Sequence, residues 1–202
     1  MSRIVFATGN KGKMKEIKEI MSDLSYEIIS MKDAGVDIDI VEDGTSFEEN
    51  ALIKARAVGA ELPDDIILAD DSGLEIDALN KEPGIYSARY MGEDTPYEVK
   101  NANFIERLQG VPKEERTARF VCCVAAHFPD GSEVVRRATI EGYIGFEPMG
   151  ENGFGFDPIF YLPGRDVSTA AISPEEKNQI SHRGKALTII KGDLKEYENT
   201  HN

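Results

Sequence analysis

Residues 4–18 read IVFATGNKGKMKEIK and hold a strand, a turn and the start of a helix. The first four residues are apolar or small, as in a buried strand. Apolar residues then recur every three or four positions, which predicts a helix from about Gly12 to Asp23. These residues are Met14, Ile17, Met21 and Leu24. Between strand and helix the chain turns through two glycines and two lysines without an acidic residue.

This turn, Thr8-Gly9-Asn10-Lys11-Gly12-Lys13, has the composition of a phosphate-binding turn. Backbone N–H groups at a helix start, the positive end of the helix dipole and a lysine can together hold phosphate oxygens, and glycine lets the backbone approach closely. The Walker pattern GxxxxGK[ST] does not occur in the chain. The alternative is a solvated turn whose lysines face water.

The rest of the chain alternates strand and helix patterns before a long hairpin, which predicts an α/β protein with a mixed sheet. Strands are expected at residues 26–30, 66–69, 120–128 and 133–141, the last two joined through Pro129-Asp130-Gly131. Helices are expected at residues 46–61 and 95–109 and from Ser173 onward, with Asp94 capping the second. Thr45-Ser46-Phe47-Glu48 reads as a capping box.

Composition sets limits on the class of protein. At 202 residues and 41% hydrophobic content, one globular domain spanning 1–202 is expected. No apolar run approaches the length of a membrane span, so a cytoplasmic location is expected. The net charge is 23 − 37 = −14, which disfavours nucleic acids and acidic membranes as partners. The adjacent Cys122 and Cys123 would point to opposite faces of a strand, which argues against a disulfide framework or a metal site there.

The charge is unevenly distributed. Residues 3–18 hold five basic residues, whereas residues 33–49 hold seven acidic residues and no basic one. A small anion handled together with a divalent cation would suit both stretches. The alternative is that both are solvated surfaces.

A pair of carboxylates follows an apolar strand at Asp70-Asp71-Ser72-Gly73. Open α/β sheets bind ligands at such strand ends, and buried carboxylates there need a counter-charge. Mg²⁺ takes one or two carboxylates plus substrate phosphates, so Asp70 and Asp71 are candidate ligands, with Glu42 or Asp43 as a further one. Oxygen ligands without a His/Cys cluster also suit Mn²⁺. Alternatively, one aspartate merely caps a turn with Gly73.

Two later segments suit a planar heterocycle. Phe154-Gly155-Phe156-Asp157-Pro158 places aromatic rings beside a hydrogen-bonding carboxylate, although core packing of the rings is an alternative. If the last helix is continuous, Arg183 lies on one apolar stripe and needs a partner, which is either an internal acid or a ligand oxygen. That stripe contains Leu187, Ile190, Leu194 and Tyr197. His182 and Lys177 lie in the same segment.

Four ordered motifs match a known family. They are ATGNKGK at 7–13, ADDSGLEIDALNKEPGIYSARY at 69–90, GFGFDPIF at 153–160 and EEKNQISHRGKAL at 175–187. From Arg3 to about Tyr197 the chain resembles the inosine/xanthosine triphosphate pyrophosphatases. The resemblance implies an elongated two-lobed α/β fold with a central mixed β-sheet flanked by helices, a substrate cleft between the lobes, and a homodimer.

The resemblance also implies a function. Members of the family hydrolyse ITP, dITP and XTP to the nucleoside monophosphate and pyrophosphate with Mg²⁺, removing deaminated purines from the nucleotide pool. By resemblance, the residues from Thr8 to Lys13 hold the triphosphate, Glu42 and Asp71 hold the metal with Asp70 beside them, and Asp71 accepts a proton. Ser72 is expected to touch the substrate. The base-side residues would be Phe154, Gly155, Phe156, Asp157, Lys177, His182 and Arg183.

A mechanism follows from these residues. Lys13 and the turn amides would neutralise charge on the leaving pyrophosphate while water attacks. Either Asp71 takes the proton from water directly or the metal lowers the pKa of the water. Donors from Lys177, His182 and Arg183 would suit the 6-oxygen of hypoxanthine and xanthine and would meet the 6-amino group of ATP unfavourably. Guanine also has a 6-oxygen, and Asp157 could accept its N1 and N2 hydrogens, so the exclusion of GTP has no explanation at this level.

Two other functions fit the same residues. One is a regulatory module that binds inosine or xanthosine nucleotides without hydrolysing them; the acids Glu42, Asp70 and Asp71 favour catalysis instead. The other is a pyrophosphatase for modified pyrimidine or other nucleoside triphosphates, which the donors around Arg183 disfavour. Identifying the products formed from each nucleotide separates the three.

Overall fold

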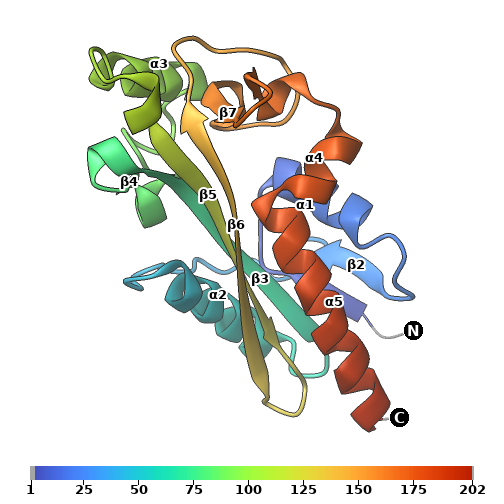
Figure 1. The fold of residues 1–202 in the computed structure, drawn as a ribbon. Coiled ribbons are helices and arrows are strands. Elements are labelled where there is room, and N and C mark those ends of the chain that lie inside the picture. The colour runs from blue at the N-terminus through green and yellow to red at the C-terminus, as the bar shows by residue number, and fades with distance from the viewer. Residues whose placement is uncertain (1–2, 202) are drawn as a thin grey trace. The chain divides into compact units, whose positions relative to one another are not determined.

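The computed structural model describes residues 3–201 and confirms a mixed α/β fold with a central sheet flanked by helices (Figure 1). The strands are β1 (Arg3–Phe6), β2 (Glu27–Ser30), β3 (Ile66–Ile76), β4 (Glu82–Pro83), β5 (Thr117–His127), β6 (Glu133–Ile144), β7 (Phe160–Leu162) and β8 (Val167–Ser168). The α-helices are α1 (Lys11–Ile20), α2 (Phe47–Glu61), α3 (Tyr97–Arg107), α4 (Pro174–Ile180) and α5 (His182–His201).

The sheet mixes parallel and antiparallel strands, as predicted. Its order is β2-β1-β3-β5-β6-β7-β8, with β4 paired to β3. β1 runs parallel to β2 and to β3, with Val5 opposite Ile29 and Ile67, whereas β7 runs antiparallel to β6 and β8. The turn that follows β1 therefore lies at the carboxyl edge of the parallel strands, where α/β sheets bind ligands.

Within the described residues the chain divides into two compact units. Unit 1 comprises 3–71, 122–138 and 183–201, and unit 2 comprises 72–121 and 139–182. The division falls inside β3, β5 and β6, so these strands contribute residues to both units. The single domain with a cleft between two lobes stays a prediction.

The core of unit 1 lies between the sheet and two helices. α1 and α5 pack on one face of β1, β3 and β5, and α2 lies on the opposite side (Figure 1). The predicted apolar stripe of α5 is confirmed, because Leu187, Ile190 and Leu194 are fully buried in this cluster. Cys122 and Cys123 are both buried, and both are free thiols.

Unit 2 has a core rich in aromatic rings. Phe104 of α3 and Phe156 pack edge to face, with ring centroids 5.6 Å apart, and Tyr97 contacts Phe156 at 5.1 Å. Phe120 of β5 lies against Phe160 at 4.3 Å. These contacts hold the segment around Phe156 against α3.

One strand differs from its prediction. β3 was expected to end at Ala69, but it continues through Asp70-Asp71-Ser72-Gly73 to Ile76. A strand carrying two adjacent carboxylates can remain in a sheet because both charges have partners, as described below. The alternative in which an aspartate merely caps a turn with Gly73 is therefore wrong.

Three helix boundaries also differ. Ser181 is extended and separates α4 from α5, so the segment after Ser173 forms two helices and not one continuous helix. The N-cap of α2 is Ser46, which accepts from the N–H of Glu49, one position later than the predicted capping box. Pro96, and not Asp94, precedes the first residue of α3.

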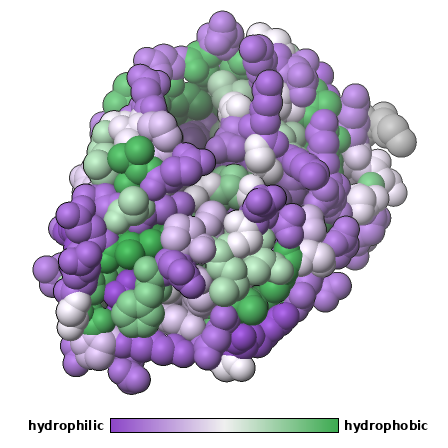
Figure 2. All heavy atoms as spheres, turned by 90° about the horizontal axis from the view of Figure 1, so that it is seen from above, coloured by the Kyte–Doolittle hydropathy of each residue, from purple (hydrophilic) through white to green (hydrophobic). Residues whose placement is uncertain are grey.

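Most of the face shown in Figure 2 is hydrophilic, and hydrophobic residues form separate groups on it. No helix among residues 3–201 is both long enough and apolar enough to cross a membrane.

The loop that leads to Phe154 is held against a short 3-10 helix, η5 (Thr169–Ala171). The N–H of Asn152 donates to the carbonyl of Ala170 at 3.0 Å. Gly150, with φ of +79°, lies so close that an added Cβ would overlap the backbone of Ala170. Glycine is required here for both its conformation and its size.

Comparing two glycine substitutions tests this packing. Gly164 has a similar φ of +75°, but nothing lies within 4 Å of an added Cβ. Gly164→Ala should cost about 1 kcal/mol for its conformation alone. Gly150→Ala should cost a further ~1–3 kcal/mol because the loop must shift away from η5. Urea unfolding of both variants measures the difference, and equal losses would show that the contact with Ala170 is unimportant.

Candidate active site

The predicted phosphate-binding turn opens α1 in unit 1. Asn10 is the N-cap, and its side chain accepts from the N–H of Lys13 at 3.0 Å. The hydroxyl of Thr8 accepts from the N–H of Asn10 at 3.2 Å. An added Cβ at Gly9 would meet nothing within 4 Å, so a ligand has room to approach the backbone there. The turn thus presents the start of a helix, where N–H groups and the dipole attract anions.

Asp70 is the centre of a buried ion network. Its side chain is 1% exposed, and the ammonium of Lys13 lies 3.1 Å from Oδ1 and 3.0 Å from Oδ2. The guanidinium of Arg183, on α5, donates to Oδ2 from Nε at 3.3 Å and from Nη2 at 3.2 Å. Arg183 also bonds Glu16 of α1. Asp70 therefore joins the turn, β3 and α5.

The charges of this network shift the pKa values of its members. Burial alone would raise the pKa of Asp70, but Lys13, Arg183 and Lys54 outweigh it and hold the pKa below its ordinary range. Burial likewise opposes the charge of Arg183, yet Asp70 and Glu16 raise its pKa. Both groups therefore stay charged at neutral pH.

Asp71 has different surroundings from its neighbour. Its Oδ2 accepts from the amide nitrogen of Asn50 at 3.2 Å, and its Oδ1 lies 3.6 Å from the ammonium of Lys54. The same ammonium lies 3.0 Å from Glu42. Burial raises the pKa of Asp71, against the lowering effect of Lys54 and Lys13. Asp71 is therefore more basic than an ordinary aspartate.

Asn50 ties the acidic loop to this carboxylate. Its side-chain oxygen accepts from the N–H of Gly44 at 2.9 Å while its nitrogen donates to Asp71. Glu42 precedes Gly44 in the same loop, so Asn50 fixes the backbone that carries Glu42 near Asp71. Asn50 is fully buried, which keeps both bonds out of water.

The donor set fits a divalent metal ion that also binds substrate. The carboxylates of Glu42 and Asp71 both reach one positive centre, the ammonium of Lys54. Within residues 3–201 no group of three acidic, histidine or cysteine side chains is placed to hold a metal. Two carboxylates with the remaining ligands from phosphate and water are what Mg²⁺ commonly uses.

The predicted base-side residues of unit 2 gather around Asp157. Its Oδ2 accepts from the ammonium of Lys177 at 2.6 Å and from the N–H of Phe154 at 2.8 Å. Its Oδ1 accepts from the hydroxyl of Thr169 at 2.8 Å. Gly153 has φ of +76°, and an added Cβ there would overlap the Asp157 carboxylate. Loop, α4 and η5 therefore meet at one carboxylate.

The aromatic residues of this loop have separate surroundings. Phe156 is 5% exposed and belongs to the core, which was the alternative to a base-stacking role. Phe154 is half-buried, and the ammonium of Lys177 lies 5.1 Å from its ring centroid. The carbonyl of Gly155 accepts from Asn101 of α3 at 3.2 Å. His182 stacks on Phe120 at 4.9 Å.

The predicted site residues thus fall into two groups. In unit 1 the structure brings Lys13 and Asp70 together, and Glu42 and Asp71 around Lys54. Arg183, predicted on the base side, bonds internal acids, which was the alternative for it. Ser72 is half-buried in β3. Contacts of these residues with metal or substrate stay predictions.

Sequence reasoning missed three polar residues of these groups. Asn50 and Lys54 lie one helical turn apart on α2, beside a stripe of small apolar residues. A buried lysine on such a face, directly after an acidic loop, was a detectable signal. Thr169 had no local signal, because its partner lies twelve positions away in the sequence.

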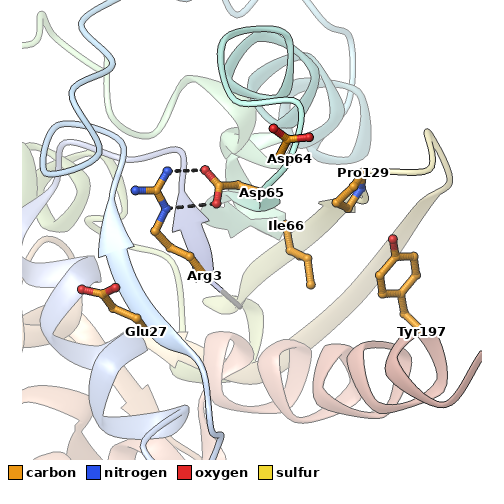
Figure 3. Close-up of a pocket in the computed structure, with 7 residues that line it drawn as sticks. All are labelled: Arg3, Glu27, Asp64, Asp65, Ile66, Pro129 and Tyr197. Atoms are coloured by element: carbon orange, nitrogen blue, oxygen red, sulfur yellow. Dashed lines mark hydrogen bonds and ion pairs between the residues drawn. The ribbon is translucent and has the colours of Figure 1, made fainter. Parts of the chain in front are cut away.

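A separate pocket of about 460 Å³ lies in unit 1 at the amino ends of the parallel strands (Figure 3). Arg3 and Asp65 face each other on one side, and Pro129 and Tyr197 line the other (Figure 3). Its remaining lining residues are Glu27, Asp64 and Ile66. None of the predicted site residues lines this pocket.

The Asp70 network predicts a pH-dependent loss of stability. Asp70→Asn leaves Lys13 and Arg183 without their shared counter-charge, which should cost about 3–5 kcal/mol at neutral pH. Because folding lowers the pKa of Asp70, its contribution is fully present above the unfolded-state pKa of about 3.9 and is lost as the pH falls through the folded value. The difference between wild type and variant should therefore be constant from about pH 5 to 8 and shrink below about pH 4.

Chemical unfolding across this pH range measures the difference. Asp64→Asn, at an exposed position, serves as the control and should change stability by less than about 0.5 kcal/mol. A loss for Asp70→Asn that matches the control, or that does not diminish in acid, would contradict the role given to the network.

Comparison with known proteins agrees with this architecture. A family model described as the Ham1 family matches residues 4–192. The dITP/XTP pyrophosphatase of Geobacillus kaustophilus (strain HTA426) is 48% identical over 190 residues, covering 94% of this chain and 93% of the relative.

Solved structures agree as well. The Ham1 protein of Staphylococcus aureus matches with a TM-score of 0.85 at 41% identity, covering 97% of this chain and 100% of that one. The Ham1 protein from Coxiella burnetii matches with a TM-score of 0.86 at 39% identity and the same coverage. The resemblance found in the four motifs is confirmed, and the chain belongs to the Ham1 family.

Proposed function

We propose that this protein hydrolyses ITP, dITP and XTP to the nucleoside monophosphate and pyrophosphate, clearing deaminated purines from the nucleotide pool. The observation that supports this most directly is the contrast between Asp70 and Asp71. One carboxylate is held by Lys13 and Arg183, while its neighbour pairs with Glu42 around a single ammonium. The relatives named dITP/XTP pyrophosphatase supply the substrate class.

In this mechanism the turn after β1 binds the polyphosphate. The amides at the start of α1 and the ammonium of Lys13 face the negative charge that develops on the leaving pyrophosphate. Asp70 keeps Lys13 in place, since its carboxylate contacts that ammonium through both oxygens. Placing the donors before the reaction avoids reorganising them during it.

Asp71 is the proton acceptor. Water attacks the α-phosphorus, the bond from that phosphorus to the bridging oxygen breaks, and pyrophosphate leaves with that oxygen. The proton of the water passes to Asp71, whose pKa burial raises and which is therefore a better base than an exposed aspartate. Asn50 and Lys54 orient its carboxylate.

Glu42 and Asp71 would hold the divalent cation, with Mg²⁺ as the expected ion and Mn²⁺ as a substitute. A bound divalent cation supplies positive charge that stabilises phosphate oxygens in the transition state. Lys54 then neutralises carboxylate charge beside it; its pKa is raised because Asp71, Asp70 and Glu42 outweigh the effect of burial.

The base pocket, by which we mean the surroundings of Phe154, Lys177 and His182, selects against purines that carry a 6-amino group. Lys177 and His182 supply donors for the 6-oxygen of hypoxanthine and xanthine, and ATP would present a donor in its place. A buried group left unpaired costs roughly 1–3 kcal/mol, so each such mismatch discriminates by about 5–150-fold. Arg183 contributes through Asp70 in this scheme, because its guanidinium bonds Asp70 and Glu16.

The proposal extends to the setting of the enzyme. It acts in the cytoplasm as a homodimer, on free nucleotides, and without nucleic-acid or membrane partners. The net charge of −14 supports the last two points, since it repels polyanions.

Pyrophosphate release from ITP, XTP, GTP and ATP in the presence of Mg²⁺ tests the function. ITP and XTP should be hydrolysed at least about 25-fold faster than ATP in kcat/KM, as two mismatches of at least about fivefold each predict. Chelation of the metal should abolish release. Equal rates for the four nucleotides, or binding of ITP without product, would refute the proposal, and the latter result would identify a regulatory module.

A set of acid-to-amide variants tests the roles of the residues. Asp71→Asn should lower kcat by about 10²–10⁴-fold without loss of the fold, because the proton acceptor is removed. Glu42→Gln should raise the Mg²⁺ concentration needed for activity, whereas Asp43→Asn, exposed in the same loop, should behave as wild type. Near-normal turnover by Asp71→Asn would rule out its assignment.

A further inference from the structure

The hydrogen-bonding capacity of Asp157 is nearly used up inside unit 2. Each carboxylate oxygen can accept about two hydrogen bonds. Oδ2 accepts from Lys177 and from the N–H of Phe154, and Oδ1 accepts from Thr169. Asp157 is only 2% exposed. The carboxylate that sequence reasoning offered to the N1 and N2 hydrogens of guanine is therefore committed to the protein itself.

Hydrogen bonds of the neighbouring residues help to hold Thr169 next to Asp157. It is 2% exposed and begins η5, where the hydroxyl of Ser168 accepts from the N–H of Ala170 at 3.1 Å. Ser168 also donates to the carbonyl of Met149, and Asn152 donates to that of Ala170. The hydroxyl of Thr169 lies 2.8 Å from Oδ1 and 3.2 Å from the carbonyl oxygen of Asp157. The loop and η5 therefore hold the Thr169 hydroxyl against Asp157.

The same carboxylate anchors the ammonium of Lys177. Lys177 is 5% exposed, and Asp157 and the ring of Phe154 both lie next to its Nζ. A carboxylate free to rotate would no longer hold this ammonium in one position. The direction of the Lys177 donors thus depends on the two bonds that orient the carboxylate, from the Thr169 hydroxyl to Oδ1 and from the N–H of Phe154 to Oδ2.

We propose that Thr169 is a specificity-determining positioning residue, which keeps the Asp157 carboxylate on Lys177 and away from the purine. The base pocket then presents donors, which suit the 6-oxygen of hypoxanthine and both oxygens of xanthine. The 2-amino group of guanine, which hypoxanthine lacks, finds no acceptor. This inference rests on the proposed function and explains how that function excludes GTP.

Thr169→Val tests the inference because it removes the hydroxyl and keeps the shape. The ratio of kcat/KM for GTP to that for ITP should rise by about tenfold or more, since Oδ1 becomes an available acceptor. KM for ITP should rise while kcat stays within about threefold, because the polyphosphate residues are unchanged. Thr169→Ser, which keeps the hydroxyl, should retain the wild-type ratio.

Ser168→Ala is the matched control. It removes a neighbouring buried hydroxyl that bonds Met149 and Ala170 but not Asp157. It should lower the melting temperature and change the GTP-to-ITP ratio much less than Thr169→Val does, because the Thr169 hydroxyl that bonds Asp157 is kept, whereas a purely structural role for Thr169 would make both variants behave alike. If Thr169→Val does not fold, Thr169→Ala is measured in its place.

Two failures are distinguishable. A wild-type protein that releases no pyrophosphate from ITP or XTP would refute the proposed function. A selective wild type whose Thr169→Val or Thr169→Ala variant keeps the same GTP-to-ITP ratio would overturn the role of Thr169 and leave the function intact. Loss of discrimination in Thr169→Ser would also overturn it.

Discussion

The pairing of Asp70 with Lys13 and Arg183 is the interaction on which the rest of unit 1 depends. A carboxylate that is 1% exposed in the middle of a strand is tolerated only if opposite charges reach it, and these come from α1 and α5. The pairing therefore fixes three segments that are far apart in the sequence, at the sheet edge where the predicted phosphate-binding turn lies. It also neutralises the charge of Asp70, which is why we propose Asp71, and not Asp70, for metal binding and proton transfer.

The two units use buried carboxylates in a similar way. Asp70 holds Lys13, the lysine proposed to bind the polyphosphate, and Asp157 holds Lys177, the lysine proposed to bind the base. In each case the buried acid fixes the position of a lysine that we propose binds the substrate. A lysine held in this way loses less conformational freedom when it binds, and its charge meets the substrate with little rearrangement. Asp71 differs because burial raises its pKa, which suits a group that accepts a proton.

Local patterns predicted the long helices and the strands β1, β2, β3, β5 and β6, but not the short strands β4, β7 and β8. The alternation of strands and helices, the turn after β1 and the hairpin at Pro129 follow from periodicity and turn chemistry, and the structure confirms them. The predicted end of β3 was wrong because the partners of Asp70 lie 57 and 113 positions away in the sequence. No local pattern reveals that the charge of Asp70 is neutralised. The break at Ser181 was not predicted because neither proline nor glycine stands at that position. The role of Phe156 was ambiguous because an aromatic side chain can equally well pack in a hydrophobic core or stack on a nucleotide base.

Crystals soaked with MnCl₂ and a non-hydrolysable ITP analogue would test the division between the two aspartates most directly. Anomalous scattering locates Mn²⁺ independently of the protein. The account predicts one ion bound by the carboxylates of Glu42 and Asp71 and by phosphate oxygens, with Asp70 still paired to Lys13 and Arg183. An ion bound by Asp70, with Lys13 displaced from it, would contradict the account.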